Sequence, residues 1–340
     1  MIIVLKPNIT QDEIDHIVGK ITSLNLQPHV SKGQYRTIIT VIGDEDIIRE
    51  QPLEAISGVE SVKPILKPYK LASKETHPDR TMVRVGDVVI GGDKLVLVAG
   101  PCAVEGEKEI IEHAKMVKKA GASLLRAGAY KPRSSPYTFQ GFGALGLKYL
   151  ARAKEETGLP IITEVMDPRD VGLIAECADV LQVGTRNMQN FNLLKELGKI
   201  DKPILLKRGM SATINEFLMS AEYILSQGNK QVILCPRGIR TFEDVTRNTL
   251  DAGAVPVLKD FSHLPVICDP SHAMGLKDYV VAAALAYVAA GADGIMVEAH
   301  PNPEEAMSDG QQTINYEQLV ELKKKLVSVA QALEEVCIDV

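Results

Sequence analysis

Basic side chains lie near the ends of several short apolar runs of this sequence or directly after them, at the points where buried strands would end. They are Arg126, Lys131, Arg133, Arg186, Lys207, Arg208 and Arg237. Guanidinium and ammonium groups bind phosphate and carboxylate groups, and arginine binds them in a bidentate manner. Any one of these residues taken alone would be a solvated surface charge. Their shared position near the ends of apolar runs predicts a binding site for an anionic substrate.

A second group of side chains has the donor types of a metal site. Cys102, His272, Glu298 and Asp309 supply a thiol, an imidazole and two carboxylates. Such a mixed set suits a borderline divalent ion such as Zn²⁺, Mn²⁺, Fe²⁺ or Co²⁺. The spacing fits no local zinc motif, so these residues meet only if the fold brings them together. The structural alternative is that Cys102 is a small buried residue and that His272 forms a hydrogen bond at a helix start.

Eight short apolar runs alternate with helical segments in the larger part of the chain. The runs are 95–99, 123–128, 160–165, 180–184, 203–207, 231–235, 265–268 and 294–298, and the clearest helices are 107–120, 214–226, 279–290 and 316–333. Apolar runs without alternation are typical of parallel strands that are buried on both faces. Eight such units predict a (β/α)₈ TIM barrel over residues 85–340. An open doubly wound sheet is the alternative, but no G-x-G-x-x-G motif follows the first run.

The barrel prediction brings both groups of side chains to one end. In (β/α)₈ barrels, the active site is formed by the carboxyl ends of the strands and the loops that follow them. The basic residues and the metal-type residues lie at these positions, and Glu164 ends the third run. His300 follows the eighth run, where it would neighbour the metal ligands.

The first 68 residues have a different pattern. Strands are expected at 2–5, 36–41 and 59–65 and helices at 10–21 and 46–56, in a βαββαβ order that is typical of an α+β ferredoxin-like domain. Residues 69–84 are polar and are interpreted as a linker, and 85–91 as a short hairpin. The first domain is either a folding or oligomerisation appendage or a small-molecule sensor of the amino-acid-binding (ACT-like) type.

Composition excludes several classes of function. The chain of 340 residues has 44 acidic and 38 basic side chains, no Trp and only 4% aromatic residues, which argues against nucleic-acid binding. No apolar run reaches the roughly 18 residues that a membrane span needs. The first residues lack a signal-peptide pattern, and the five cysteines are scattered and odd in number, so we expect a cytoplasmic protein.

Several short motifs resemble those of one enzyme family. They are Gly100-Pro101-Cys102, the stretch from Arg126 to Ser135 (RAGAYKPRSS), Lys207-Arg208-Gly209, Asp269-Pro270-Ser271-His272 and Ser308-Asp309-Gly310. Together they are similar to the 3-deoxy-D-arabino-heptulosonate 7-phosphate (DAHP) synthases. The resemblance covers the whole predicted barrel and is greatest to the short type I branch, which has an N-terminal ferredoxin-like regulatory domain.

The resemblance implies a metal-dependent condensation of phosphoenolpyruvate, D-erythrose 4-phosphate and water to DAHP and phosphate, the first step of the shikimate pathway. It implies one divalent metal ion (Mn, Fe, Co or Zn) on Cys102, His272, Glu298 and Asp309. Phosphoenolpyruvate would bind to Arg126, Lys131, Arg186, Lys207 and Arg237, and erythrose 4-phosphate to Arg133, Ser134 and Ser135. Lys131 and Glu164 are the candidates for proton transfer.

The same resemblance implies feedback inhibition by tyrosine or phenylalanine and a homotetramer. One alternative is 3-deoxy-D-manno-octulosonate 8-phosphate synthase, which uses arabinose 5-phosphate. That family tends to have Ala-Asn-Arg-Ser-Ser where this chain has Lys131-Pro132-Arg133-Ser134-Ser135, so Pro132 favours the four-carbon aldose. The other alternative is a non-catalytic amino-acid-binding regulator on a degenerate barrel, and the intact basic and metal-type groups argue against it.

Overall fold

The computed structural model describes residues 1–33, 36–43, 47, 52–63, 67–133 and 135–335. The chain divides into two compact units. One comprises Met1–Arg80 with Asp260–His263, and the other comprises Thr81–Lys259 with Leu264–Val340. Among the described residues, no helix has both the length and the apolar character needed to cross a membrane.

The first unit has the predicted ferredoxin-like arrangement. Its elements are β1 (Ile2–Leu5), α1 (Gln11–Ser23), β2 (Gln27–Lys32), β3 (Thr37–Ile42), the 3₁₀ turn η1 (Leu53–Ala55) and β4 (Val59–Lys63). The strands form an antiparallel sheet in the order β2-β3-β1-β4. Thr10 and Glu13 form a capping box at the start of α1, and Ile14, Ile17 and Ile21 bury its apolar face.

Two features of this unit differ from the sequence pattern. We located no strand at β2, because it is an edge strand with few apolar residues and with Pro28 inside it. The helix expected at 46–56 falls largely outside the described residues, and its described end is the 3₁₀ turn η1. Within residues 69–84, which the sequence pattern indicates as a polar linker, Tyr69 and Ser73 are completely buried, and Ser73 pairs with Ser262. The proposed domain boundaries at 68 and 84 stay a prediction.

The second unit is the predicted (β/α)₈ barrel, and all eight predicted strands are present. They are β7 (Val96–Gly100), β8 (Leu124–Arg126), β9 (Ile161–Val165), β10 (Val180–Val183), β11 (Ile204–Lys207), β12 (Val232–Cys235), β13 (Ile267–Cys268) and β14 (Gly294–Glu298). Neighbouring strands are parallel, in the order β12-β11-β10-β9-β8-β7-β14-β13. The parallel pairs Leu234–Val266 and Arg237–Asp269 join the two outer strands and close the ring.

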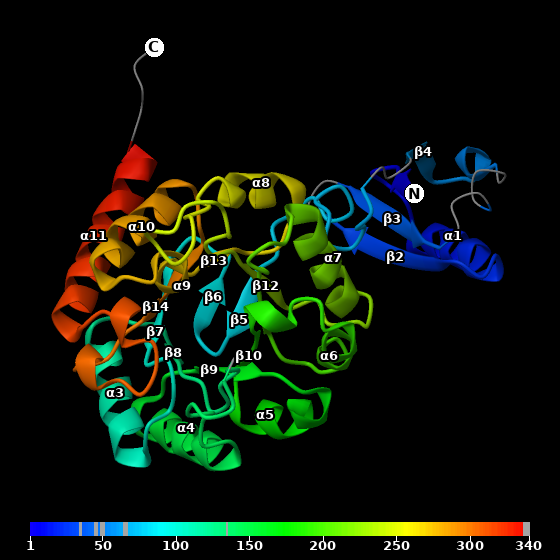
Figure 1. Ribbon diagram of the computed structural model, residues 1–340. Coiled ribbons are helices and arrows are strands. Elements are labelled where there is room, and N and C mark those ends of the chain that lie inside the picture. The colour runs from blue at the N-terminus through cyan, green and yellow to red at the C-terminus, as the bar shows by residue number, and fades with distance from the viewer. Residues whose placement is uncertain (34–35, 44–46, 48–51, 64–66, 134, 336–340) are drawn as a thin grey trace. The chain divides into compact units, whose positions relative to one another are not determined.

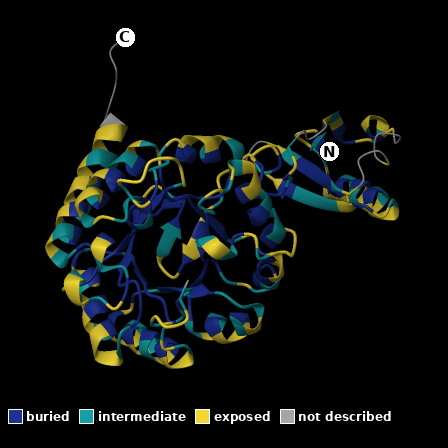
Figure 2. Cartoon of the chain, in the orientation of Figure 1, coloured by how far each residue is buried: buried dark blue, intermediate teal, exposed yellow. Residues whose placement is uncertain are grey.

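Helices surround this ring, with their exposed faces outward and the strands buried inside (Figures 1 and 2). They are α3 (Glu107–Lys119), α4 (Ala144–Thr157), α5 (Val171–Cys177), α6 (Phe191–Leu197), α7 (Ile214–Leu225), α8 (Ala254–Phe261), α10 (Lys277–Ala289) and α11 (Tyr316–Glu335). The short helix α9 (Pro270–Met274) follows β13 and has no exposed residue. All four helices that the periodicity predicted are present, each with ends within two residues of the expected ones.

A hairpin precedes the first strand of the barrel, as the sequence predicts. Its strands are β5 (Val83–Val85) and β6 (Val88–Ile90). Val83, Val85 and Ile90 belong to one apolar cluster with side chains from the interior of the barrel, among them Val96 and Leu124 at the amino ends of β7 and β8. The hairpin therefore closes the amino end of the barrel with apolar side chains and leaves the carboxyl end for polar groups.

Candidate active site

A cavity of about 310 Å³ lies at the carboxyl ends of the barrel strands. Every described residue that the sequence assigned to substrates lines it: Arg126, Lys131, Arg133, Ser135, Glu164, Arg186, Lys207 and Arg237. Ser134 lies outside the described residues. Arg208 is not among the lining residues, because its side chain forms an ion pair of 2.6 Å with Asp251 instead. Arg208 therefore does not belong to the substrate cavity.

The basic groups of the cavity are unusually buried. Arg126, the last residue of β8, is 4% exposed and donates to Glu298 Oε1 at 2.9 Å and to Pro101 O at 3.0 Å. Arg237 follows β12 and donates to the carbonyl oxygen of His272, while burial lowers its pKa. Burying a cation costs several kcal/mol unless partners compensate it. A site that keeps several buried cations around one cavity is suited to an anion.

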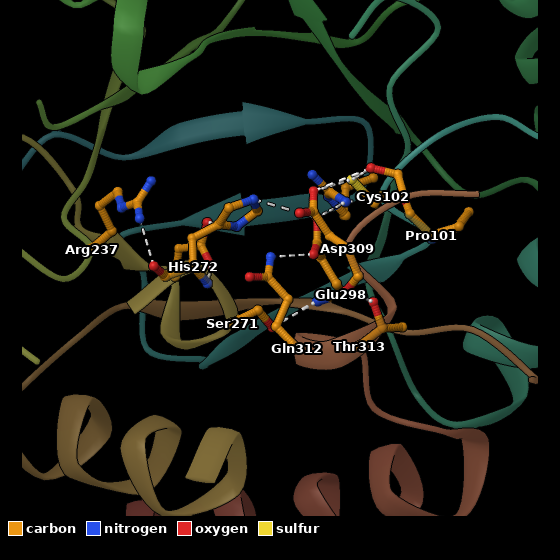
Figure 3. A network of polar contacts seen from close by, with 12 residues as sticks. Pro101, Cys102, Arg237, Ser271, His272, Glu298, Asp309, Gln312 and Thr313 are labelled. Carbon is orange, nitrogen blue, oxygen red and sulfur yellow. Dashed lines mark hydrogen bonds and ion pairs between the residues drawn. The ribbon is translucent and has the colours of Figure 1, made fainter. Parts of the chain in front are cut away.

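Three of the four predicted metal ligands meet at the wall of this cavity (Figure 3). The donor atoms of Cys102, Glu298 and Asp309 all lie within 4.8 Å of one another, and Cys102 Sγ is 2.9 Å from Asp309 Oδ2. The fourth residue, His272, lies beside them with its Nε2 atom 3.5 Å from Glu298 Oε1. Residues far apart in sequence meet here because β7, β13 and β14 are neighbours in the sheet.

The electrostatics of this group fit a divalent cation. Burial and the nearby Glu298 charge raise the pKa of Cys102 to about 12. Burial acts in the same direction on Asp309, but the hydrogen bond from Cys102 and the charges of His272 and Lys131 hold the pKa of Asp309 below its usual value. A metal ion held by the thiol and the two carboxylates, with His272 beside them, would compensate the charge of the carboxylates and would stabilise the thiolate. The residues present therefore fit the implied metal.

Asp269 connects the metal group to the basic cavity, and sequence reasoning gave it no role. Its carboxylate contacts Lys207 Nζ and lies 2.8 Å from His272 Nδ1, so that the other ring nitrogen of His272 faces Glu298. It also accepts the backbone N–H of His272 at 3.0 Å, as the N-cap of α9. An Asp three residues before a His, with Pro between them, is a helix-start signal that would have indicated this position.

Arg247 and Gln312 are further residues that the sequence did not reveal. Gln312 is 2% exposed and donates to Glu298 Oε2 at 2.5 Å. Arg247 lines the cavity and donates to Gln312 Oε1 at 2.8 Å and to Asp309 Oδ1 at 3.4 Å. Arg247 lies in an irregular loop and Gln312 ends the short 3₁₀ turn η5 (Gly310–Gln312). Neither periodicity nor a strand end marks these positions, so no sequence signal pointed to them.

Glu164 has a carboxylate oxygen that is available to a substrate or water. Its Oε2 atom accepts from Gln182 Nε2 at 3.3 Å, whereas the buried Oε1 atom has no hydrogen-bond partner within the described chain. A Cβ atom at Gly184 would lie 2.0 Å from this Oε1. Glycine at 184 therefore leaves the room that the carboxylate occupies.

His300 contacts other partners than the metal group. Its Nε2 lies 3.0 Å from Glu105 Oε2, and its ring packs edge-on against His113 at 4.5 Å. The other Glu105 oxygen accepts the N–H of Met307, so this pair holds the loop that leads to Asp309. The cysteines of the described chain are free thiols, and Cys235 and Cys268 are buried in strands, as expected for structural residues.

Two family models together match nearly the whole chain. The model of the DAHP synthetase I family matches residues 69–335, and that of the DAHP synthase ferredoxin-like domain matches residues 1–67. The chain is 49% identical to phospho-2-dehydro-3-deoxyheptonate aldolase of Thermotoga maritima over 98% of both proteins. A crystal structure described as DAHP synthase from that organism superposes with a TM-score of 0.77 at 48% identity, covering 98% of this chain and 97% of that one.

The alternative aldose has weaker support. The 2-dehydro-3-deoxyphosphooctonate aldolase of Desulfotalea psychrophila is 31% identical, over 73% of this chain and 95% of that protein. Residues 1–67, which match a ferredoxin-like domain model, are part of the longer and stronger match to the Thermotoga protein.

Proposed function

The chain belongs to the DAHP synthetase I family, and on that premise we propose which residues of this DAHP synthase bind its substrates and its metal ion. The reaction joins phosphoenolpyruvate, erythrose 4-phosphate and water and gives DAHP and phosphate. The observation that carries the residue assignment is the cavity itself, in which seven basic side chains face two carboxylates, with the thiol-containing metal group at its wall.

Phosphoenolpyruvate binds among the deepest of these basic groups. Arg126, Lys207 and Arg237 are each at most 4% exposed, so an anion that binds to them loses most of its hydration shell. Arg186 is more exposed and lies at the same cavity, where it completes the charge compensation with Lys131. Charge-assisted hydrogen bonds in such a site orient the carboxylate and phosphate of the substrate.

Erythrose 4-phosphate binds next to the metal group. Arg133 and Ser135 lie in the loop after β8, and together with Ser134 of the same KPRSS stretch they receive the phosphate of the sugar. Arg133 donates to Ser308 Oγ at 2.6 Å, and Ser308 immediately precedes the proposed ligand Asp309. A sugar whose phosphate lies on Arg133 therefore extends its aldehyde toward the metal ligands.

Cys102, His272, Glu298 and Asp309 would hold the metal ion, which would supply Lewis acidity toward the aldehyde oxygen. Lys131 donates to Cys102 Sγ at 2.9 Å and to Cys102 O at 3.1 Å, so its ammonium group lies beside the reacting aldehyde and delivers the proton that the new hydroxyl needs. Carbon 3 of phosphoenolpyruvate forms the new bond to the aldehyde carbon.

Glu164 acts at the other reacting carbon. The oxygen of Glu164 that lacks a partner within the described chain orients the water that adds at carbon 2 of phosphoenolpyruvate and takes its proton. Cleavage of the C–O bond from carbon 2 to phosphate, with the hydroxyl proton at carbon 2 passing to the departing phosphate, then leaves the keto group of DAHP. The buried cations stabilise the departing phosphate in a site from which bulk water is largely excluded.

The test is an assay with phosphoenolpyruvate and each aldose phosphate, with and without a chelator, that follows loss of the enol absorbance and release of phosphate. Turnover with erythrose 4-phosphate that the chelator abolishes and added metal restores is the expected result. Preference for arabinose 5-phosphate would contradict the role of Pro132, and turnover that resists the chelator would contradict the metal site.

We also propose that residues 1–68 bind tyrosine or phenylalanine as a feedback inhibitor, that the enzyme is a homotetramer and that it is cytoplasmic. The match of residues 1–67 to a ferredoxin-like domain of DAHP synthases supports the first of these, and the free thiols support a reducing compartment. Deleting residues 1–68 should leave turnover intact and remove inhibition. Inhibition that persists in the truncated enzyme would place the effector site in the barrel.

A further inference from the structure

We propose that the divalent ion reaches its ligands through a second cavity, on the far side of Arg247, rather than through the substrate cavity. This inference rests on the proposed metal site and adds the route by which that site is filled. It assigns Arg247 as the side chain that separates the two cavities.

The second cavity adjoins the metal group. It has a volume of about 520 Å³ and is lined by the loop from Asp244 to Arg247 and by the segment from Asp309 to Gln312, with Gly275 and Leu276. Arg247 and Asp309 line both cavities. Asp309 is a proposed ligand, and Gln312 donates to the ligand Glu298, so the wall of the second cavity is the outer side of the metal site.

The two cavities differ in charge. Among the described residues, the substrate cavity has seven basic side chains and two carboxylates, Glu164 and Asp309. The second cavity has Arg247 as its basic side chain and two carboxylates, Asp244 and Asp309. Clefts lined by one sign of charge concentrate ions of the opposite sign and repel those of the same sign. A free divalent cation is therefore repelled by the first cavity and attracted by the second.

The backbone of Arg247 is held in place, whereas its side chain can move away from the second cavity and open the route to the metal ligands. Its backbone N–H donates to Met274 O at 3.0 Å, and its stem lies against Gly275, where an added Cβ atom would be 2.3 Å from Arg247 Cβ. Gly275 has a φ of +72°, which favours glycine independently. The backbone is thus fixed, while the side chain is 41% exposed and contacts Gln312 and Asp309 through its guanidinium group.

These contacts define an order of events for a cation. Asp244 attracts the ion from solvent, and the ion replaces the guanidinium group of Arg247 at Asp309. Arg247 swings toward solvent while this happens, since its ion pair with Asp309 is long and partly exposed and is therefore weak. After the ion has reached its ligands, the Arg247 side chain returns to Gln312 and holds the amide that contacts Glu298.

The experiment measures the rate at which the metal-free enzyme takes up Co²⁺, through the absorbance of the cobalt–thiolate bond. Asp244→Asn changes only the second cavity and Arg186→Met only the first. We expect Asp244→Asn to slow uptake about threefold at low salt, with a smaller effect at high salt. Arg186→Met should leave the rate unchanged. Arg247→Met should accelerate uptake and also chelator-driven release, by about threefold or more.

The opposite pattern, in which Arg186→Met accelerates uptake and Asp244→Asn has no effect, would overturn the route. A complete block of uptake by saturating phosphoenolpyruvate would also overturn it, because that ligand fills only the substrate cavity. Equilibrium binding separates this failure from that of the proposed metal site. One Co²⁺ per chain with the wrong kinetics refutes the route alone, whereas no bound Co²⁺ in the unsubstituted enzyme refutes the metal site.

Discussion

The two ends of the barrel are made from the same strands and have opposite chemistry. At the amino end, Val83, Val85 and Ile90 of the hairpin pack against apolar side chains of the strands. At the carboxyl end, buried side chains such as Arg126 and Glu298 are ionic. Apolar burial stabilises a fold by about 25 cal/mol per Å², whereas buried charges seldom repay their desolvation. The amino end therefore stabilises the barrel, and the carboxyl end is retained for its chemistry.

The ionic end tolerates its charges because several of them are paired with one another. Arg126 pairs with Glu298, and Asp269 lies between Lys207 and His272. In such a network the loss of one member leaves its partners buried and without compensation, which costs more than the pair contributes. Substitutions at the carboxyl end should therefore affect binding and turnover together, whereas substitutions at the amino end should affect only stability.

Among the substitutions at the two ends of the barrel, Cys102→Ala should cause the largest loss of metal affinity and turnover. Removing the thiol takes one donor from the metal group, and metal affinity should fall by at least about 100-fold, with turnover lost in parallel. Metal content after dialysis and the rate with both substrates measure this. Cys235→Ala is the matched control, since Cys235 is a buried thiol in β12 that is not in the metal group. An active, metal-free Cys102→Ala enzyme would refute the assignment.

Asp269→Asn should cause a smaller loss of metal affinity than Cys102→Ala. The amide no longer balances the charge of Lys207, and it presents the wrong group to His272 Nδ1. Metal affinity should fall about 10- to 100-fold, and the KM for phosphoenolpyruvate should rise as well. Chelator competition and steady-state kinetics measure the two effects separately. Asp251→Asn, which breaks the Arg208 pair outside the cavity, should change neither. A change in only one of the two quantities would show that Asp269 does not link them.

The contrast between the two ends also explains what the sequence could predict. Strands buried on both faces are continuous apolar runs, so all eight barrel strands were found, and strand ends then indicated where Arg126, Lys207 and Glu298 would lie. Local pattern failed at β2, where an edge strand has little apolar character, and at Arg208, which follows a strand but pairs with Asp251 outside the cavity. A strand end fixes a residue's position and leaves its side-chain direction open.

The partners of the site residues were harder to predict than the site residues. Arg247 comes from a loop and Gln312 from a single 3₁₀ turn, neither of which has a periodic pattern. The neighbouring strands β12, β13 and β14 bring the two residues together. The role of Gly184 could not be predicted from the sequence either, because this glycine leaves space for Glu164, a residue of the adjacent strand. Such roles depend on tertiary contacts, which a single sequence does not specify.

At the amino end, Ile90→Ala tests the stabilising role. Ile90 is fully buried in the hairpin cluster, so the substitution leaves a cavity and should lower the free energy of unfolding by about 2–5 kcal/mol. Urea denaturation measures it, while kcat and metal affinity should be unchanged at temperatures where the variant is folded. Met82→Ala is the control, because the Met82 side chain is 66% exposed. It should change the free energy of unfolding by no more than about 0.5 kcal/mol. Altered kinetics in folded Ile90→Ala would show that the two ends are coupled.

The smallest effect concerns pH, and it should arise at His113, which packs against His300. Burial and the neighbouring His300 lower the pKa of His113 to about 4, while Glu105 and Glu109 act in the opposite sense. Between this value and the ordinary histidine pKa of about 6.5, the unfolded chain binds a proton that the folded chain does not, so the stability of the fold decreases as the pH falls.

His113→Gln removes this titration. Between pH 6.5 and 4.5 its free energy of unfolding should therefore decrease by about 1–3 kcal/mol less than that of the unsubstituted enzyme. Urea denaturation at several pH values measures the difference, and comparing the two slopes cancels the contribution of the carboxylates, which are common to both proteins. Ile90→Ala should shift the whole stability profile downward and keep its slope, because no titratable group is lost from the apolar end. Parallel profiles for His113→Gln and the unsubstituted enzyme would mean that His113 takes up its proton equally in the folded and unfolded chains, and acid sensitivity would then have to arise from the carboxylates alone.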